Sequence, residues 1–236
     1  MKVNANALKQ ALSLLLTQDN TVMTIKTSDD GWSMIAMDPS KVSMAQVTLT
    51  PEAFEEFVAT DSFSVDPEKL LKALDGKGQM VEFELSGGQV ILKGNHISTR
   101  VSLCNPPEAE PRIPPLDAGV SFIMNAGPLK QVVKALDEMM SMTVMVDETQ
   151  IIFEGYNEAG AGTRLEIPTE ECVAAVGEGR AVYGLAVIKP FIKTLPNDAE
   201  LEIEFDTDYP IVVRYKMDGA EFTWLGAPWI EDGIDG

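Results

Sequence analysis

The sequence predicts an α+β fold made of two copies of one unit, each with two helices packed on antiparallel strands. Three observations predict it: a helix motif that occurs twice, strands that alternate apolar residues with Glu, and a proline-rich segment between the two copies. We therefore expect an N-terminal domain at 1–104, a connector at 105–118 and a C-terminal domain at 119–236.

The first helix motif repeats 121 residues later, where ALKQAL at 7–12 is matched by PLKQVV at 128–133. The apolar positions follow the i, i+3, i+4, i+7 spacing of one helical face. They are Leu8, Ala11, Leu12 and Leu15 in the first copy, and Leu129, Val132, Val133 and Leu136 in the second. A second motif places Leu70, Leu71 and Leu74 over Phe191, Ile192 and Leu195. These patterns predict helices at 5–17, 66–75, 127–138 and 187–195.

The strand after the second helix of each copy carries Glu at every other position, namely Glu82 and Glu84, then Glu200, Glu202 and Glu204. Apolar residues occupy the positions between them. A period of two with one charged face indicates a strand with one side on the core and one side in water. Turn signals such as Gly87-Gly88 and Asp218-Gly219 separate the strands.

Composition excludes several classes of protein. The 236 residues are 45% apolar, but no run approaches the ~20 apolar residues of a membrane helix. The N-terminus has no signal-peptide pattern, so we expect an intracellular protein that does not contact membranes. Two cysteines, Cys104 and Cys172, fit a reducing compartment.

Catalysis and cofactors are not expected. The only histidine, His96, has no neighbouring Cys or acidic cluster that would suggest a metal site or a catalytic triad. The many carboxylates lie on alternating strands, where they should point to solvent. General acid–base chemistry needs two groups held at a defined distance in a cleft.

The charge is unevenly distributed along the chain. Eighteen Lys and Arg against 37 Asp and Glu give a net charge of −19, which by itself argues against nucleic acid as a partner. The predicted helices nevertheless carry seven lysines against five acids. Helix surfaces ordinarily carry Lys, so two explanations stay open: solvated helices, or a weakly basic surface for sequence-independent phosphate contacts on an acidic protein.

Three stretches resemble a known family. They are AMDPSKVSMAQVTL at 36–49, the connector CNPPEAEPRIPPLDAG at 104–119, and DYPIVVRYKMDGAEFTWLGAPWIEDG at 208–233. Together with the duplicated unit they resemble PCNA, the sliding clamp of archaeal and eukaryotic replication. The order and spacing match over essentially the whole chain.

The resemblance implies a trimeric ring of two-domain subunits, with helices lining a hole that encloses double-stranded DNA without reading its sequence. The DNA-facing residues would be Lys9, Lys69, Lys72, Lys77, Lys130, Lys134, Lys189 and Lys193. Subunits of the family join by strand pairing, which here would use His96, Ser98, Arg100 and Ser102 on one edge and Cys172, Ala174 and Val176 on the other.

The family also implies a pocket for short partner motifs that carry a Gln and apolar or aromatic anchors. It would use Met37, Asp38, Lys41, Val42, Ile113, Pro114, Pro210, Leu225, Ala227 and Pro228. Trp229 stands where the family usually has a basic residue. The implied partners are a DNA polymerase, a clamp loader, a flap nuclease, a DNA ligase and further copies of the chain, in the cytoplasm and associated with the nucleoid, or in the nucleus of a eukaryote.

Two alternatives to a homotrimeric clamp remain at this stage. One is a subunit that works only in a heteromeric ring, of a replication or checkpoint type, because self-complementarity of an interface is not readable from one chain. The other is an acidic interaction scaffold that never encloses DNA.

Overall fold

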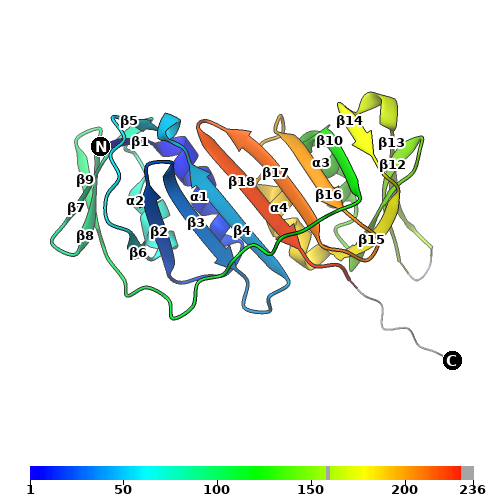
Figure 1. The fold of residues 1–236 in the computed structure, drawn as a ribbon, viewed down its shortest axis with the longest axis horizontal. Helices are drawn as coiled ribbons and strands as arrows, with labels where there is room; N and C mark the ends of the chain where they lie inside the picture. Colours follow the sequence, from blue (N-terminus) through cyan, green and yellow to red (C-terminus); the bar gives the residue numbers. More distant parts are fainter. Residues whose placement is uncertain (158–159, 230–236) are drawn as a thin grey trace. The chain divides into compact units, whose positions relative to one another are not determined.

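The structure is a computed structural model that describes residues 1–157 and 160–229. It divides into two compact units (Figure 1), one formed by Met1–Ile113 with Lys216–Thr223 and the other by Pro114–Tyr215 with Trp224–Gly236. The division falls within the expected connector, and the units are described separately below. The Ile-Glu-Asp signature at 230–232 lies outside the described residues.

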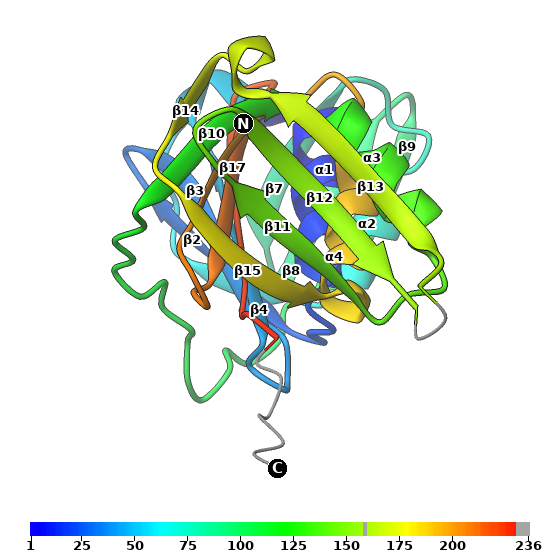
Figure 2. The same cartoon turned by 90° about the vertical axis from the view of Figure 1, so that its right-hand side faces the viewer.

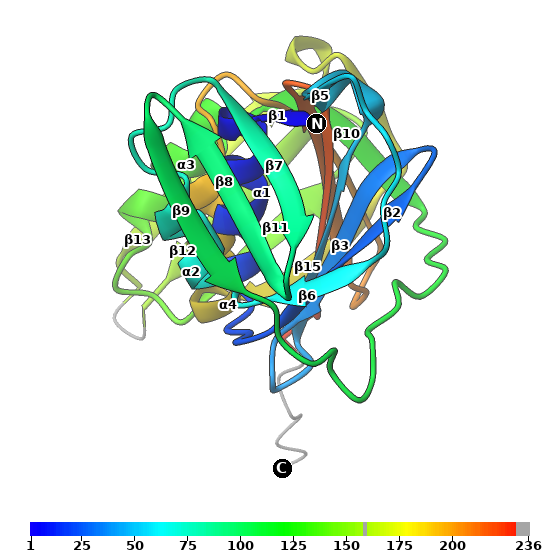
Figure 3. The same ribbon diagram turned by 90° about the vertical axis from the view of Figure 1, so that its left-hand side faces the viewer.

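The first unit contains two antiparallel sheets and two α-helices in its described residues. One sheet has the order β5-β1-β7-β8-β9, and the other contains β4, β3, β2 and β6 as neighbours. Helices α1 and α2 pack beside each other and are seen behind β7, β8 and β9 in Figure 3. The elements are β1 (Lys2–Asn4), α1 (Ala5–Leu16), β2 (Met23–Ser28), β3 (Gly31–Met37), β4 (Ser43–Leu49), η1 (Pro51–Ala53), β5 (Phe54–Glu55), β6 (Phe63–Val65), α2 (Pro67–Ala73), β7 (Met80–Ser86), β8 (Gln89–Gly94) and β9 (Ile97–Ser102).

The second unit repeats this plan. One sheet has the order β13-β12-β11-β15 (Figure 2), and β14, β10, β16 and β17 are neighbours in the other. Helices α3 and α4 pack together as α1 and α2 do. The elements are β10 (Val120–Asn125), α3 (Ala126–Ala135), β11 (Ser141–Val146), β12 (Gln150–Tyr156), β13 (Gly162–Pro168), η2 (Thr169–Glu171), β14 (Ala174–Val176), β15 (Gly179–Gly184), α4 (Leu185–Thr194) and β16 (Glu200–Phe205). The last two strands, β17 (Ile211–Met217) and β18 (Ala220–Gly226), contain residues assigned to both units.

The predicted α+β class, the duplication and the helix positions are confirmed, with shifts at helix ends. Helix α3 ends at Ala135 rather than at 138, because Leu136 leaves helical geometry with φ −89° and ψ 20°. Helix α4 begins at Leu185, two residues before the prediction, and contains Pro190. The predicted apolar faces are buried in all four helices, from Leu8 and Leu12 in α1 to Ile192 in α4, except that Leu71 of α2 is only half-buried.

Each unit has an aromatic cluster in its core. In the first unit Trp32 is fully buried and meets Phe54 and Phe83 edge to face, with ring centroids 5.0 and 4.7 Å apart. In the second unit Phe191 of α4 stacks on Trp224 with centroids 4.4 Å apart and parallel rings. Aromatic side chains bury the most apolar area per residue, so the first cluster joins strands of the first unit and the second holds α4 against β18.

The start of α2 gives a first testable prediction. The Asp66 carboxylate caps the helix by accepting a hydrogen bond from the Lys69 N–H at 3.0 Å, and Pro67 occupies the first helical position. Because an N-cap residue satisfies a backbone donor that the helix leaves unpaired, Asp66→Ala should lower the free energy of unfolding by about 1 kcal/mol at pH 7. Asp66→Asn, which keeps the acceptor, should lose only a fraction of that in urea unfolding.

The same cap should make stability depend on pH. Burial acts to raise the pKa of Asp66, but hydrogen bonds from the backbone N–H and the ammonium of Lys69 outweigh it, so the pKa is lowered on folding. The cap therefore stabilises the fold above pH ~4 and loses this contribution as the pH falls further. The loss of unfolding free energy caused by Asp66→Ala should therefore be smaller at pH ~3 than at pH 7. An equal loss at both pH values would show that the charge of the Asp66 carboxylate does not contribute to the cap.

Candidate nucleic-acid and partner interfaces

The helix lysines of the first unit are neutralised by neighbouring acids. Lys69 of α2 lies 3.1 Å from Asp66, the N-cap of that helix, and Lys72 lies 2.7 Å from Glu68 within the helix. Lys9 of α1 reaches Asp75, just after α2, at 3.4 Å. The hydrogen bond to Glu68 raises the pKa of Lys72, so the ammonium is fully charged. The expected basic surface of α1 and α2 is therefore a set of ion pairs.

Lys77 is not a DNA-facing residue, and that prediction is wrong. Its side chain is buried, with 2% of the residue exposed, and its Nζ donates to Thr99 Oγ1 at 2.7 Å. Gly76 and Gly78 flank it with φ of 73° and 86°, a backbone path that glycine permits and that turns the lysine inward. Burial lowers the pKa of Lys77, and Asp75 partly restores it.

The helix lysines of the second unit line a groove of about 600 Å³ between α3 and α4. Lys130 donates to the Leu195 carbonyl at 2.7 Å, and Lys189 binds Asp137, through its carbonyl and its carboxylate. Lys134 and Lys193 are exposed at the rim. Val133 and Ile192, both almost fully buried, form part of the lining. The groove therefore combines an apolar floor with four cations.

Strand β9 is a free edge of its sheet. Its register with β8 pairs Leu92 with Thr99, and Leu103 N–H donates to the Gly88 carbonyl at 2.9 Å. Because hydrogen-bonded and non-hydrogen-bonded pairs alternate in antiparallel strands, Ile97, Thr99 and Val101 bond to β8. Ser98, Arg100 and Ser102, which are predicted interface residues, therefore direct their backbone groups away from β8. His96 lies in the turn before the strand with φ 63°.

The second unit has a longer free edge that the sequence prediction missed. Strand β13 spans seven residues and, among the described strands, pairs only with β12, whereas β14 spans three and pairs with β10. Asn157 N–H donates to Ala161 and Thr169 N–H donates to Thr149, which fixes Thr163, Leu165 and Ile167 as the residues bonded to β12. Arg164, Glu166 and Pro168 thus face outward. Cys172, Ala174 and Val176 lie on or beside β14 and are intermediate or exposed.

The predicted partner-pocket residues of the first unit lie at the end of β3 and in the loop after it. The Asp38 carboxylate accepts hydrogen bonds from Ser43 N–H at 2.6 Å and Ser40 N–H at 2.9 Å, so this residue shapes the loop. Lys41 is exposed with φ 59°, and Val42 is 37% exposed. Met37 is half-buried.

The predicted pocket residues of the second unit come from three separate parts of its sequence, which are the end of the connector, the turn before β17 and the C-terminal segment. Leu225 is 5% exposed, and Pro114, Pro210, Ala227 and Pro228 are more accessible. Trp229 N–H donates to the Val182 carbonyl of β15 at 2.6 Å. Its indole lies over Gly184, where a methyl group would come within 3.1 Å of the ring. The segment is thereby anchored to β15 with an indole that remains 43% exposed.

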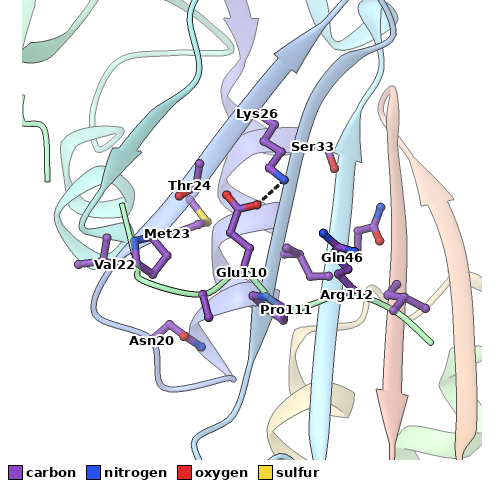
Figure 4. A pocket seen from close by; sticks show the side chains of 14 residues that line it. Asn20, Val22, Met23, Thr24, Lys26, Ser33, Gln46, Glu110, Pro111 and Arg112 are labelled. Atoms are coloured by element: carbon purple, nitrogen blue, oxygen red, sulfur yellow. Dashed lines mark ion pairs between the residues drawn. The ribbon is translucent and has the colours of Figure 1, made fainter. Parts of the chain in front are cut away.

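A second groove in the first unit, of about 330 Å³, lies between the connector and strands β2, β3 and β4. Figure 4 shows Glu110 of the connector in an ion pair with Lys26 of β2 across it. Ile113 lines this groove, whereas Met37, Asp38, Lys41 and Val42 do not. The connector is thus tied to the outer strands of its own unit.

The described residues contain no group of three or more His, Cys, Asp or Glu side chains placed to hold a metal ion. Cys104 and Cys172 are both free thiols. Among the helices in these parts of the chain, none is both long and apolar enough to cross a membrane.

Comparison with known proteins agrees with this geometry. No family model matches the chain. It is similar to curated proteins described as DNA polymerase sliding clamps, at 28% identity to that of Methanosarcina mazei and 26% to that of Methanosarcina barkeri, with 97% of each chain covered in both cases. In solved structures it is similar to A. fulgidus PCNA bound to the C-terminal region of FEN-1, with a TM-score of 0.90, 21% identity and 98% of each chain covered. PCNA from Thermococcus kodakaraensis gives a TM-score of 0.86 at 22% identity, with 97% of this chain and 99% of that chain covered.

The duplicated unit, with paired helices on antiparallel sheets, gives this chain the fold of the PCNA structures. Within that fold, the sequence relatives are archaeal DNA polymerase sliding clamps, and the predicted resemblance to PCNA-type clamps is confirmed.

Proposed function

We propose that this protein is a DNA sliding clamp, a processivity factor without catalytic activity that encircles duplex DNA and tethers replication and repair enzymes. The observation that carries the proposal is the likeness to polymerase sliding clamps over 97% of the chain. A clamp stays on DNA by topology, so it needs no tight grip on the phosphates. A protein with a net charge of −19 can work in this way.

The ring would be a homotrimer closed by strand pairing. We propose that β9 of one subunit pairs with β13 of the next, because each is a free edge with backbone groups directed outward. The seven residues of β13 offer more pairing than the three of β14, so this assignment replaces Cys172, Ala174 and Val176 as the second half of the interface. Pairing satisfies donors and acceptors that would otherwise invite aggregation.

Partners would dock through short motifs at the residues that the resemblance implies, which are Met37, Val42 and Ile113 in the first unit and Ala227 and Pro228 in the second. A flap nuclease is the best supported, because a PCNA of the same fold is described with the C-terminal region of FEN-1 bound. A DNA polymerase, a DNA ligase and an ATP-dependent clamp loader complete the proposed set. The setting would be the nucleoid in the cytoplasm.

Retention on circular DNA tests the proposal most directly. The protein is loaded onto a nicked plasmid with its clamp loader and ATP, and the plasmid is then cut once. A clamp should stay on the circle at high salt and slide off the linear product. Release at the same rate from both forms would exclude topological linkage and favour the acidic scaffold. In light scattering the mass should be three times 25.7 kDa; a monomer at every concentration would favour a heteromeric ring.

Trp229 should report and strengthen partner binding. Trp32 and Trp224 are 0% and 1% exposed, so Trp229 is the accessible indole. A peptide with a Gln and aromatic anchors should shift the tryptophan emission to the blue, and Trp229→Phe should abolish the shift while calorimetry still detects binding. Trp229→Ala should weaken the peptide by about fivefold, or about 1 kcal/mol. Unchanged affinity would remove Trp229 from the site.

A further inference from the structure

We propose that DNA backbone phosphate is held in the groove between α3 and α4, so that the second unit of each subunit, and not the first, makes the direct contacts with DNA. This inference rests on the proposed clamp function and specifies which part of each subunit contacts DNA. The family resemblance implies DNA-facing lysines on all four helices; the arrangement of charges in this chain divides them into two unlike groups.

Charge spacing along the helices separates the two units. In α2 the lysines stand at i+3 from Asp66 and at i+4 from Glu68, which are the spacings of opposite-charge pairs on one helical face. In the second unit Lys130 and Lys134 are i, i+4 on α3, and Lys189 and Lys193 are i, i+4 on α4. Like charges at this spacing destabilise a helix, so the lysine pairs lower the stability of α3 and α4 themselves. A cationic surface is present here although it does not help these helices to form.

The groove offers more than exposed lysines. Two rows of cations face each other across a space of about 600 Å³, and the one acid in its lining, Asp137, is already bound by Lys189. Lys134 and Lys193 also lie in the last turns of their helices, where any cation is favoured. Lys130 and Lys189 lie in the middle of their helices, and each donates to a carbonyl at the C-terminal end of the other helix. The combined site is complementary to an anion.

The occupant is a phosphate of duplex DNA. Lys130 and Lys189 are held by the Leu195 and Asp137 carbonyls, which leaves further ammonium protons on each for a second acceptor. Lys134 and Lys193 have side chains long enough to reach across the rim. Lysine contacts of this kind are sequence-independent and release counterions, as sliding requires.

Salt dependence distinguishes direct contacts from the general field of the protein. Affinity for a fluorescein-labelled 30-base-pair duplex is measured by anisotropy between ~25 and ~200 mM salt, where each phosphate contact adds about 0.9 to the slope of log K against log salt. Lys134→Gln/Lys193→Gln should make the slope shallower by about 1 for each of these lysines that binds a phosphate. Lys69→Gln/Lys72→Gln, which removes the same charge from α2, should leave the slope unchanged.

Freeing the lysines of the first unit gives the reverse test. Glu68→Gln/Asp75→Asn releases Lys72 and Lys9 from their acids, so it should steepen the slope. Glu200→Gln/Glu202→Gln makes the same change in charge on the exposed face of β16. This control should leave the slope of log K against log salt unchanged. Equal changes of slope for Lys134→Gln/Lys193→Gln and Lys69→Gln/Lys72→Gln would overturn the proposal that only the second unit contacts DNA directly. Failure of retention on circular DNA by the wild type would instead refute the clamp function itself, so the two failures are distinguishable.

Discussion

Glu166→Pro is expected to turn the trimer into a monomer of about a third of the wild-type mass. Leu165 and Ile167 bond to β12, so the N–H of Glu166 points to the free edge of β13. Proline there removes an outward donor and adds a ring where the neighbouring β9 would approach, without taking a bond from the β12 ladder. Pro168 already occupies an outward position of the same strand.

Glu166→Ala is the matched control for the ring-closure prediction. It removes the carboxylate that accepts from Arg164 Nε at 2.6 Å but keeps the N–H, so the trimer should persist. Arg100→Pro, at an outward position of β9, should give the same monomer as Glu166→Pro. Circular dichroism checks that each variant is folded. A folded Glu166→Pro trimer in light scattering would exclude β13 as the ring-closing strand and return attention to β14.

The sequence predicted the duplication and the helix faces because both depend on local periodicity. Leu8, Ala11, Leu12 and Leu15 share one face at helical spacing whatever the rest of the chain does, and all are buried. Helix ends were less accurate, since Leu136 continues the apolar pattern of α3 although it no longer has helical geometry. An apolar residue can stay on the core after its helix has ended.

The free edge of β13 and the burial of Lys77 were harder to predict, because both depend on residues that are distant in the sequence. Strand β13 alternates Leu165 and Ile167 with charged residues, which indicates a half-buried strand but not which strand lies beside it. Lys77 follows α2 and looks like a solvated cation. The signal for its burial is a glycine on each side, which allows the backbone to turn its side chain toward Thr99. Among the predicted partner-pocket residues, only Asp38 could be assigned a structural role from nearby sequence. An Asp before Pro-Ser commonly shapes a turn by accepting backbone hydrogen bonds.

Trp224→Ala is expected to lower the free energy of unfolding by about 3–5 kcal/mol, the usual cost of removing a large aromatic from a core. Trp224 is 1% exposed and stacks on Phe191, so its removal leaves a cavity beneath α4 within the second unit. The measurement is urea unfolding at one fixed protein concentration, because a trimer gains stability with concentration. Near-ultraviolet circular dichroism reports the disappearance of the stacked pair.

Trp224→Phe separates packing from hydrogen bonding at this position. The Trp224 Nε1–H is buried and, within the described residues, has no hydrogen-bond partner. A buried donor without a partner destabilises the fold, so phenylalanine packs less apolar surface but also removes that cost. Trp224→Phe should therefore cost less than half of what Trp224→Ala costs. If the two substitutions cost the same, a phenyl ring would not replace any part of the indole's contribution, and stacking on Phe191 would not be what holds α4 to the sheet.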